Sequence, residues 1–245
     1  MYQQTTALHR AMLASLRPSL AGGSEALSIS EQIAMQLADE IVNERYMPND
    51  RLQEIGISER YKVSRGPVRE ALRILENAGL VTIAPRRGAI VTQLSAKEVA
   101  DVFDIRAVLA GLGARRLAET RSKDDIDMLR RHLAALNKLA KKTGPKASAD
   151  YVDAVVEFGL SISEASGNER LNSMVTLLFH QTLRYSRLGL SSPERRVQSC
   201  ENWSELVDHI AAGRGAQAEQ TARRLVEESK VHAIRLLREE KDAAP

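Results

Sequence analysis

Ten consecutive residues carry the strongest signal in the chain: Val63-Ser64-Arg65-Gly66-Pro67-Val68-Arg69-Glu70-Ala71-Leu72. The apolar residues Val68 and Leu72 recur at a helical spacing. Arg65 and Arg69 are also four residues apart, and Arg73 continues their row, so the three arginines form a second stripe on the same helix. The stretch therefore predicts a helix with one apolar face and one basic face.

Shorter elements flank this helix. Upstream, residues 29–42 repeat apolar residues at helical spacing after Ser28 or Ser30, either of which can cap the start, and Leu52, Ile55 and Ile57 form a shorter apolar set. Downstream, residues 80–83 and 89–92 are expected strands on either side of a turn at 85–88. Three helices plus a β-hairpin predict a winged helix-turn-helix over residues 28–94.

Charge is concentrated within this domain although the whole chain carries only +3. Residues 60–92 hold seven Arg and Lys against two Glu, whereas residues 28–59 hold two Arg against seven acids. A surface that binds DNA phosphates is expected to show this polarity. Arginines at the start of a recognition helix reach base edges in the major groove, and a basic hairpin tip reaches the minor groove. The candidate DNA contacts are Ser64, Arg65, Gly66, Arg69, Arg73, Arg86, Arg87 and Gly88.

The second half of the chain, residues 95–245, contains only helical patterns. Ser95 begins a capping box, Ser122 and Ser148 are expected caps of the next two helices, and Pro193 stands at the first position of a later one. Six helices joined by short turns predict an antiparallel bundle, so the chain as a whole is mainly α. Residues 1–27 are expected to be a flexible tail, with an amphipathic transit-type helix as the alternative.

Composition excludes several classes of protein. One cysteine, Cys200, allows no internal disulfide, and no apolar run is long enough to span a membrane. The sequence has no nucleophile motif, phosphate-binding loop or His-Glu-x-x-His, so we do not expect an enzyme. A cytoplasmic protein is the interpretation that remains.

The helix motif, together with Gly79-Leu80-Val81 and Pro85-Arg86-Arg87-Gly88-Ala89, resembles the DNA-binding domain of the GntR superfamily of bacterial transcriptional regulators. The helical half resembles the FCD effector domain of the FadR-like branch, through residues 103–106, 114–118, 164–168 and 210–213. Two departures are mild: Asn49 stands where Gly is usual, and Gly66 where Thr is usual. The resemblance implies a homodimer that binds an inverted-repeat operator and responds to a small metabolite, more often as a repressor.

Many FCD domains hold a divalent metal through one Asp and three His. In this chain the corresponding positions are Val155, Gly159, Trp203 and Leu225, none of which can coordinate a metal through its side chain. We therefore expect no metal cofactor at this site. A relocated site that uses His180 or His209 stays open.

The same positions define an expected effector pocket, more apolar than the usual one and with extra space at Gly159. Arg106 matches a family arginine that faces the ligand, and it would bind a carboxylate; a salt bridge to a neighbouring helix is its alternative. His180 and Arg184 share a helix face and are further candidates, with an exposed face as the alternative, and Trp203 could instead be a core residue. The candidate effector contacts are Arg106, Val155, Gly159, His180, Arg184, Trp203 and Leu225. The rival hypothesis is a DNA-binding dimer whose effector half no longer binds a ligand and is constitutive or partner-controlled.

Overall fold

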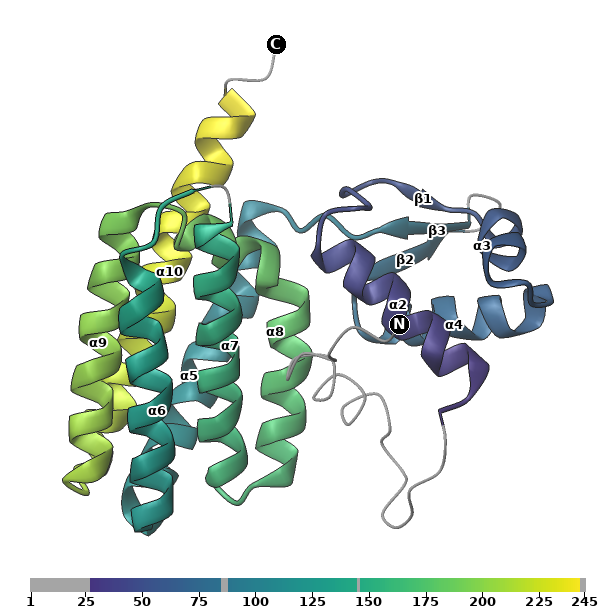
Figure 1. Cartoon of the computed structure of the whole chain (residues 1–245). Coiled ribbons are helices and arrows are strands. Elements are labelled where there is room, and N and C mark those ends of the chain that lie inside the picture. The colour runs from purple at the N-terminus through teal and green to yellow at the C-terminus, as the bar shows by residue number, and fades with distance from the viewer. Residues whose placement is uncertain (1–26, 85–87, 145, 243–245) are drawn as a thin grey trace. The chain divides into compact units, whose positions relative to one another are not determined.

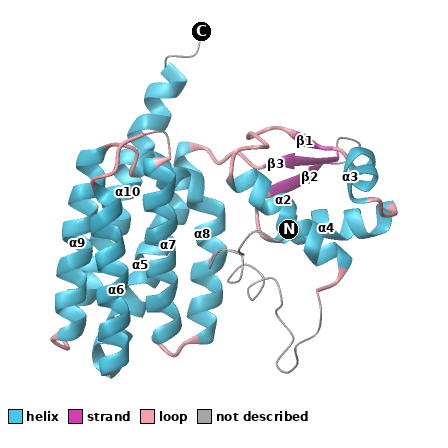
Figure 2. Ribbon diagram, in the orientation of Figure 1, coloured by secondary structure: helices cyan, strands magenta, loops and turns pink. Residues whose placement is uncertain are grey.

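The computed structural model describes residues 27–84, 88–144 and 146–242. The chain divides into two compact units, and the boundary lies between Leu94 and Ser95. Within the described residues, the first unit contains three helices and a small sheet, and the second contains six helices (Figures 1 and 2). The expected tail, residues 1–27, falls outside the described residues except for its last member.

The helices of the first unit pack around a small apolar core. They are α2 (Ile29–Val42), α3 (Glu54–Tyr61) and α4 (Arg65–Asn77). Ser28 is the cap of α2, because its hydroxyl accepts from the Glu31 N–H and the Glu31 carboxylate accepts from the Ser28 N–H. Helices α2 and α4 lie against each other and bury Ile33, Leu37, Val68, Leu72 and Leu75. The predicted helical pattern is confirmed.

A sheet of three antiparallel strands closes this unit, in the order β1-β3-β2. The strands are β1 (Arg51–Leu52), β2 (Val81–Ala84) and β3 (Gly88–Val91). Residues 82 and 90 are opposite each other in the hairpin, and residues 52 and 89 in the second pair. The hairpin was predicted but β1 was not, because two residues are too few to show an alternating pattern. Asn49, before β1, has φ of 72°, which is the left-handed turn that its side chain tolerates.

The second unit is a bundle of long helices (Figure 1). They are α5 (Ala96–Thr120), α6 (Lys123–Ala140), α7 (Ala147–Ala165), α8 (Glu169–Gly189), α9 (Pro193–Ala211) and α10 (Gly215–Asp242). Helix α5 is central, because it contacts α7, α8, α9 and α10. None of the described helices is both long and apolar enough to cross a lipid bilayer.

Caps define most of the helix starts in this unit. The capping boxes of Ser95 with Glu98 and of Ser122 with Asp125 are both present, as the sequence predicts. Ser148 is not the cap of α7, because the helix begins one residue earlier, at Ala147. The Ser148 hydroxyl instead donates to the carbonyl of Arg187, 3.1 Å away on α8.

One buried arginine links the ends of two helices. Arg196 on α9 is 2% exposed. Its guanidinium donates to the carbonyl oxygens of Lys142 at 2.9 Å and Ser191 at 2.7 Å, with Leu190 at 3.5 Å. These carbonyls follow the last turns of α6 and α8, where no helical N–H is available to them. Arg196 is therefore a structural residue.

A short segment, residues 92–94, joins the two units. Its first two residues are bonded to the first unit: the Thr92 N–H donates to the Leu80 carbonyl at 3.0 Å, and the Asn49 amide donates to the side-chain oxygen of Gln93. Directly after Leu94, Ser95 begins the capping box of α5.

Candidate functional site

The basic stripe on α4 is solvent-exposed along its whole length. Arg65, Arg69 and Arg73 are exposed, whereas Val68 and Leu72 on the opposite side of the helix are buried. Pairing between α2 and α4 produces this orientation, because it uses the apolar face of α4. The stripe is thus available to a polyanion.

The first turn of α4 is open to solvent. Ser64 occupies the cap position, with φ of −70° and ψ of 166°, but its hydroxyl makes no capping hydrogen bond. A Cβ built on Gly66 would have only the Ser64 Oγ as a neighbour, at 4.0 Å. The free backbone N–H groups of a helix start attract phosphate oxygens. Ser64 and Gly66 leave space for a phosphate at this end.

The three arginines differ in their partners. The Arg69 Nε donates to the Glu54 Oε2 on α3 at 2.9 Å, and Arg73 lies 3.9 Å from Glu70. Arg65 makes no ion pair with any described residue. Sequence reasoning did not find Glu54, since its contact with Arg69 depends on how α3 packs on α4. Glu54 holds the guanidinium of Arg69 near the start of α4.

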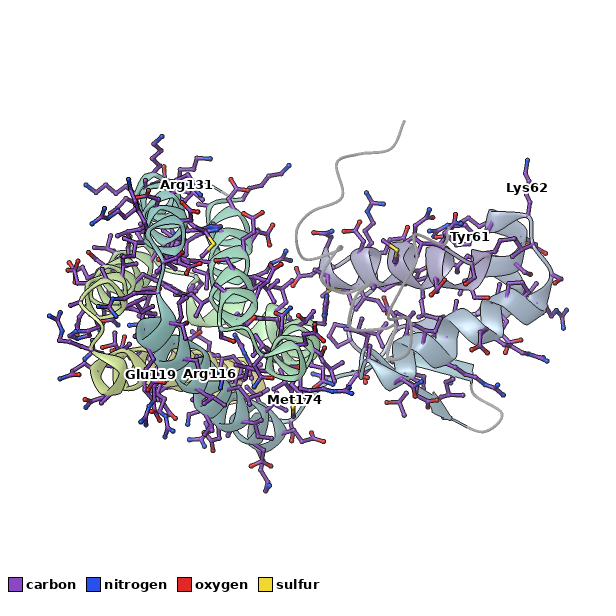
Figure 3. The ribbon with its side chains drawn as sticks, turned by 90° about the horizontal axis from the view of Figure 1, so that it is seen from below. Tyr61, Lys62, Arg116, Glu119, Arg131 and Met174 are labelled. Atoms are coloured by element: carbon purple, nitrogen blue, oxygen red, sulfur yellow. The ribbon has the colours of Figure 1, made fainter. Side chains whose placement is uncertain are left out.

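Not every basic residue of the 60–92 window belongs to this surface. Arg60 forms an ion pair with Glu40 on α2, and its guanidinium lies 4.7 Å from the centre of the Tyr61 ring. The hydrogen bond to Glu40 raises the pKa of Arg60. Arg60 therefore neutralises part of the acidic helix α2. Lys62, in the turn between α3 and α4, has φ of 54° and extends away from the ribbon (Figure 3).

The hairpin tip is only partly within the described residues. Gly88 is exposed, begins β3 and has φ of 75°, a conformation that glycine adopts without strain. Arg86 and Arg87 lie outside the described residues. Their role as minor-groove contacts stays a prediction.

The second unit contains a cavity of about 80 Å³ enclosed by five of its helices, α5 and α7 to α10. Of the seven residues predicted to contact an effector, five line it: Arg106, Val155, Gly159, Trp203 and Leu225. The other two are on α8 but outside the lining; His180 is buried and Arg184 is half-buried.

Arg106 is a buried cation without an anionic partner. It is 8% exposed, and its Nη1 donates to the Thr182 Oγ1 at 2.7 Å and the Ser186 Oγ at 3.1 Å. Its guanidinium lies 4.8 Å from the centre of the Phe103 ring and 4.4 Å from that of Phe179. Among the described residues no carboxylate lies within 4.0 Å of it, so the alternative of a salt bridge to a neighbouring helix is wrong for this part of the chain.

Burial lowers the pKa of Arg106 to about 9. The shift has this direction because removal from water penalises the charged form of a base. At pH 7 the guanidinium is still protonated. The cavity therefore presents one positive charge.

Two further polar atoms at the cavity have no hydrogen-bond partner. They are the Trp203 Nε1 and the Ser229 Oγ, on residues 7% and 8% exposed. The Trp203 ring is stacked on Phe158, with 4.3 Å between ring centres, so its orientation is fixed. Sequence reasoning proposed Trp203 for the pocket but missed Ser229, which no motif distinguishes.

The space expected at Gly159 is not open. A Cβ built there would lie 2.8 Å from the Phe179 Cζ, so the ring of Phe179 fills the position. The expectation of extra room at Gly159 is wrong, because an aromatic side chain from α8 occupies it. Gly159 is required for this ring to lie over Arg106.

The lining residues do not fit a divalent metal. None of them is a carboxylate, an imidazole or a thiol, the groups that bind such ions in proteins. Nor does any other group of three His, Cys, Asp or Glu within the described ranges have the arrangement of a metal site. Of the two histidines considered for a relocated site, His209 contacts Glu205 and Arg214.

Comparisons with known proteins place both units in one family. Residues 29–91 match the model "Bacterial regulatory proteins, gntR family", and residues 101–228, more than half of the chain, match the FCD domain.

Individual proteins agree with these matches. The repressor GlaR of Escherichia coli is 30% identical over 76% of this chain and 84% of its own. The regulator YdhC of Bacillus subtilis is 32% identical over 44% of this chain and 48% of its own. The solved structure of E. coli McbR/YncC, 20% identical, covers 88% of this chain and 100% of that protein with a TM-score of 0.68, which supports the fold. The chain belongs to the GntR family of bacterial transcriptional regulators, DNA-binding proteins rather than enzymes, in the branch that carries an FCD domain.

Proposed function

We propose that this chain is a cytoplasmic homodimeric repressor that binds an inverted-repeat operator and responds to a small carboxylate in the helical unit. The observation that carries this proposal is the buried, uncompensated cation of Arg106 in a closed cavity, on a chain whose other unit exposes a basic recognition helix. Repression is proposed because relatives such as GlaR carry that name.

The exposed stripe of α4 is proposed to enter the major groove. Arg65, without an ion pair in the described chain, and Arg69, held by Glu54, lie at the end of the helix that reads base edges. Ser64 and Gly66 would lie against a phosphate, because the helix start there is open. Arg73, one turn further along, would contact the backbone, and Arg86, Arg87 and Gly88 would contact the minor groove.

A helix face supports the proposed dimer. On α5, Ile105, Val108 and Leu112 are 50%, 50% and 40% exposed and lie on one side of the helix. Contiguous exposed apolar residues mark interaction surfaces. A dimer interface with twofold symmetry must fit a copy of itself, and this stripe satisfies that condition.

The fit follows from the order of residues along α5. If two copies of α5 pack antiparallel about Val108, Ile105 lies opposite the partner's Leu112, and Asp101 lies opposite the partner's Arg116. Asp101 and Arg116 are both exposed at the two ends of the stripe. The apolar centre and the opposite charges are thus complementary to a second copy of the chain.

The effector is proposed to bind in the cavity with its carboxylate on Arg106, and to alter the spacing of the two DNA-binding units in the dimer. Val155, Gly159, Trp203 and Leu225 would form the walls around it. No metal cofactor is proposed, since the lining offers no ligand for one. His180 and Arg184, outside the lining, are proposed to act only through their neighbours on α8.

Arg65→Ala and Arg69→Ala test the DNA interface. We expect each to lower affinity for the DNA flanking its own gene at least tenfold, because a lost bidentate base contact costs about 1–3 kcal/mol. Arg130→Ala, which removes an exposed arginine from α6, is the control and should bind normally. Fluorescence anisotropy measures all three. Wild-type affinity in Arg65→Ala would show that α4 is not the recognition helix.

The double variant Ile105→Lys, Leu112→Lys tests the dimer. Four lysines would face each other in the antiparallel arrangement, so we expect a monomer by light scattering. Val197→Lys, an exposed apolar residue on α9, is the control and should stay dimeric. A double variant that stays dimeric would place the interface elsewhere.

A further inference from the structure

We propose that the cavity recognises a small monoanion with a second, neutral hydrogen-bond acceptor, and does so without a metal: Arg106 binds the anionic group, and the indole N–H of Trp203 binds the acceptor. A short-chain α-keto or hydroxy monocarboxylic acid has this chemistry. The inference rests on the proposed function only in treating the cavity as the effector site.

The charge of the ligand follows from the charge of the lining. Arg106 is the one charged side chain among the residues that enclose the cavity. Its present partners, Thr182 and Ser186, are neutral hydroxyls, so one negative charge would compensate it. A second carboxylate would be buried without a cation, which costs several kcal/mol. A monoanion therefore fits and a dianion does not.

The second group follows from Trp203. An indole N–H can only donate, and in this structure it is buried without a partner. Buried donors in native proteins are almost always paired, so an acceptor is missing from the cavity. Stacking on Phe158 fixes the ring and aims the N–H at one place. The Ser229 hydroxyl, also without a partner, can donate to or accept from the same ligand.

The size and shape of the body follow from the remaining walls. They are apolar, and include Leu109, Val155, Leu206 and Leu225. A water-sized group needs roughly 10–15 Å³ of this kind of volume, so a cavity of about 80 Å³ holds on the order of five to eight such groups. An acid of about that many non-hydrogen atoms with an apolar chain matches.

The absence of metal ligands from the lining makes this recognition distinct. Val155, Trp203 and Leu225 contribute apolar surface and one N–H, where a metal-dependent site needs carboxylate and imidazole. The indole N–H and the guanidinium together replace what a metal would supply, which is attraction for two oxygens of an organic acid. Binding should therefore persist in a chelator.

Isothermal titration calorimetry of the full chain in EDTA tests the proposal with four probes of similar length. α-Ketocaproate has the anion and the acceptor, caproate has only the anion, caproamide has neither a charge nor a keto group, and adipate has two charges. We expect α-ketocaproate to bind about five- to tenfold more tightly than caproate, as one hydrogen bond contributes. Caproamide and adipate should bind at least a hundredfold more weakly than α-ketocaproate.

Two variants assign the contacts. Trp203→Phe keeps an aromatic ring on Phe158 but removes the N–H, so α-ketocaproate and caproate should bind it equally, with caproate within about twofold of wild type. Arg106→Gln should lose both acids. Circular dichroism confirms that each variant is folded.

Four results would overturn the proposal. They are no binding by either monocarboxylate, binding that requires added Mg²⁺ or Zn²⁺, tighter binding of adipate than of caproate, and a keto preference that survives in Trp203→Phe. DNA affinity, measured without any acid, keeps the two proposals apart, because loss of operator binding would count against the proposed function and leave the cavity chemistry untouched.

Discussion

Arg106→Met should leave the ligand-free protein as stable as wild type, or more so, although it removes the largest polar contact of the bundle core. Burial lowers the pKa of Arg106 to about 9. At about 1.4 kcal/mol for each pH unit, the displacement from the ordinary guanidinium value corresponds to roughly 4–5 kcal/mol of destabilisation. The two hydroxyl hydrogen bonds and the contacts with Phe103 and Phe179 offset roughly 3–5 kcal/mol of it.

The charged side chain thus contributes close to nothing to folding, whereas a buried methionine contributes about 1.5–3 kcal/mol. Some of that is lost to imperfect packing. We expect a gain of about 0–2 kcal/mol. For a protein of this size, the melting temperature changes by about 2–4 °C per kcal/mol, so the variant should melt at the wild-type temperature or up to about 8 °C higher.

The sign of the pH dependence follows from the same contact. Because the pKa of the cation is lowered in the folded state, its cost is fully present at neutral pH and is relieved as pH rises above about 9. Wild type should therefore gain on Arg106→Met in alkaline buffer. Thermal unfolding at pH 7 and pH 9.5, followed by the fluorescence of Trp203, measures both effects.

Arg196→Met is the matched control. It is the same substitution at a comparably buried arginine, but this guanidinium serves carbonyls at the ends of α6 and α8. Leaving them without a donor should cost about 2–4 kcal/mol, so the melting temperature should fall by at least about 4 °C. If Arg106→Met fell as far as Arg196→Met, the Arg106 guanidinium would be a structural group and the reasoning that assigns it to a ligand would fail.

Two further predictions concern packing and DNA recognition. Gly189→Ala should lower stability by about 1–3 kcal/mol, because its Cβ would lie 2.5 Å from the Ser229 carbonyl oxygen, whereas Gly56→Ala, with open space around it, should raise stability by up to about 1 kcal/mol; urea unfolding compares them, and equal effects would contradict the close approach of α8 and α10. Glu54→Gln should weaken operator binding a few-fold by releasing Arg69, as anisotropy would detect; tighter binding would mean that Glu54 competes with DNA for that arginine.

Much of the fold could be predicted because its helices begin at residues with specific chemistry. Ser28, Ser95 and Ser122 each accept from the third residue of the helix that follows, and that pattern is local. Ser148 has the same residue type, but its hydroxyl finds carbonyls of another helix, a contact between segments about 40 residues apart. Residue type alone does not distinguish these two situations.

The cavity was less predictable because helical spacing groups residues onto a face without saying which face points inward. His180 and Arg184 share a face of α8, yet Phe179 and Ser186 line the cavity instead. The unpartnered hydroxyl of Ser229 depends on the packing of α8 on α10, which no pattern within either helix encodes.

The segment that joins the two units sets the length of a leash. Thr92 and Gln93 are fastened to the first unit, and Ser95 is fixed in the capping box of α5. Even fully extended, the steps from residue 91 to residue 95 reach only about 14 Å. A regulator with so short a leash cannot let its reading heads drift and search independently. It suits operators with one fixed spacing, and a few inserted glycines here should broaden the set of spacings that the protein tolerates.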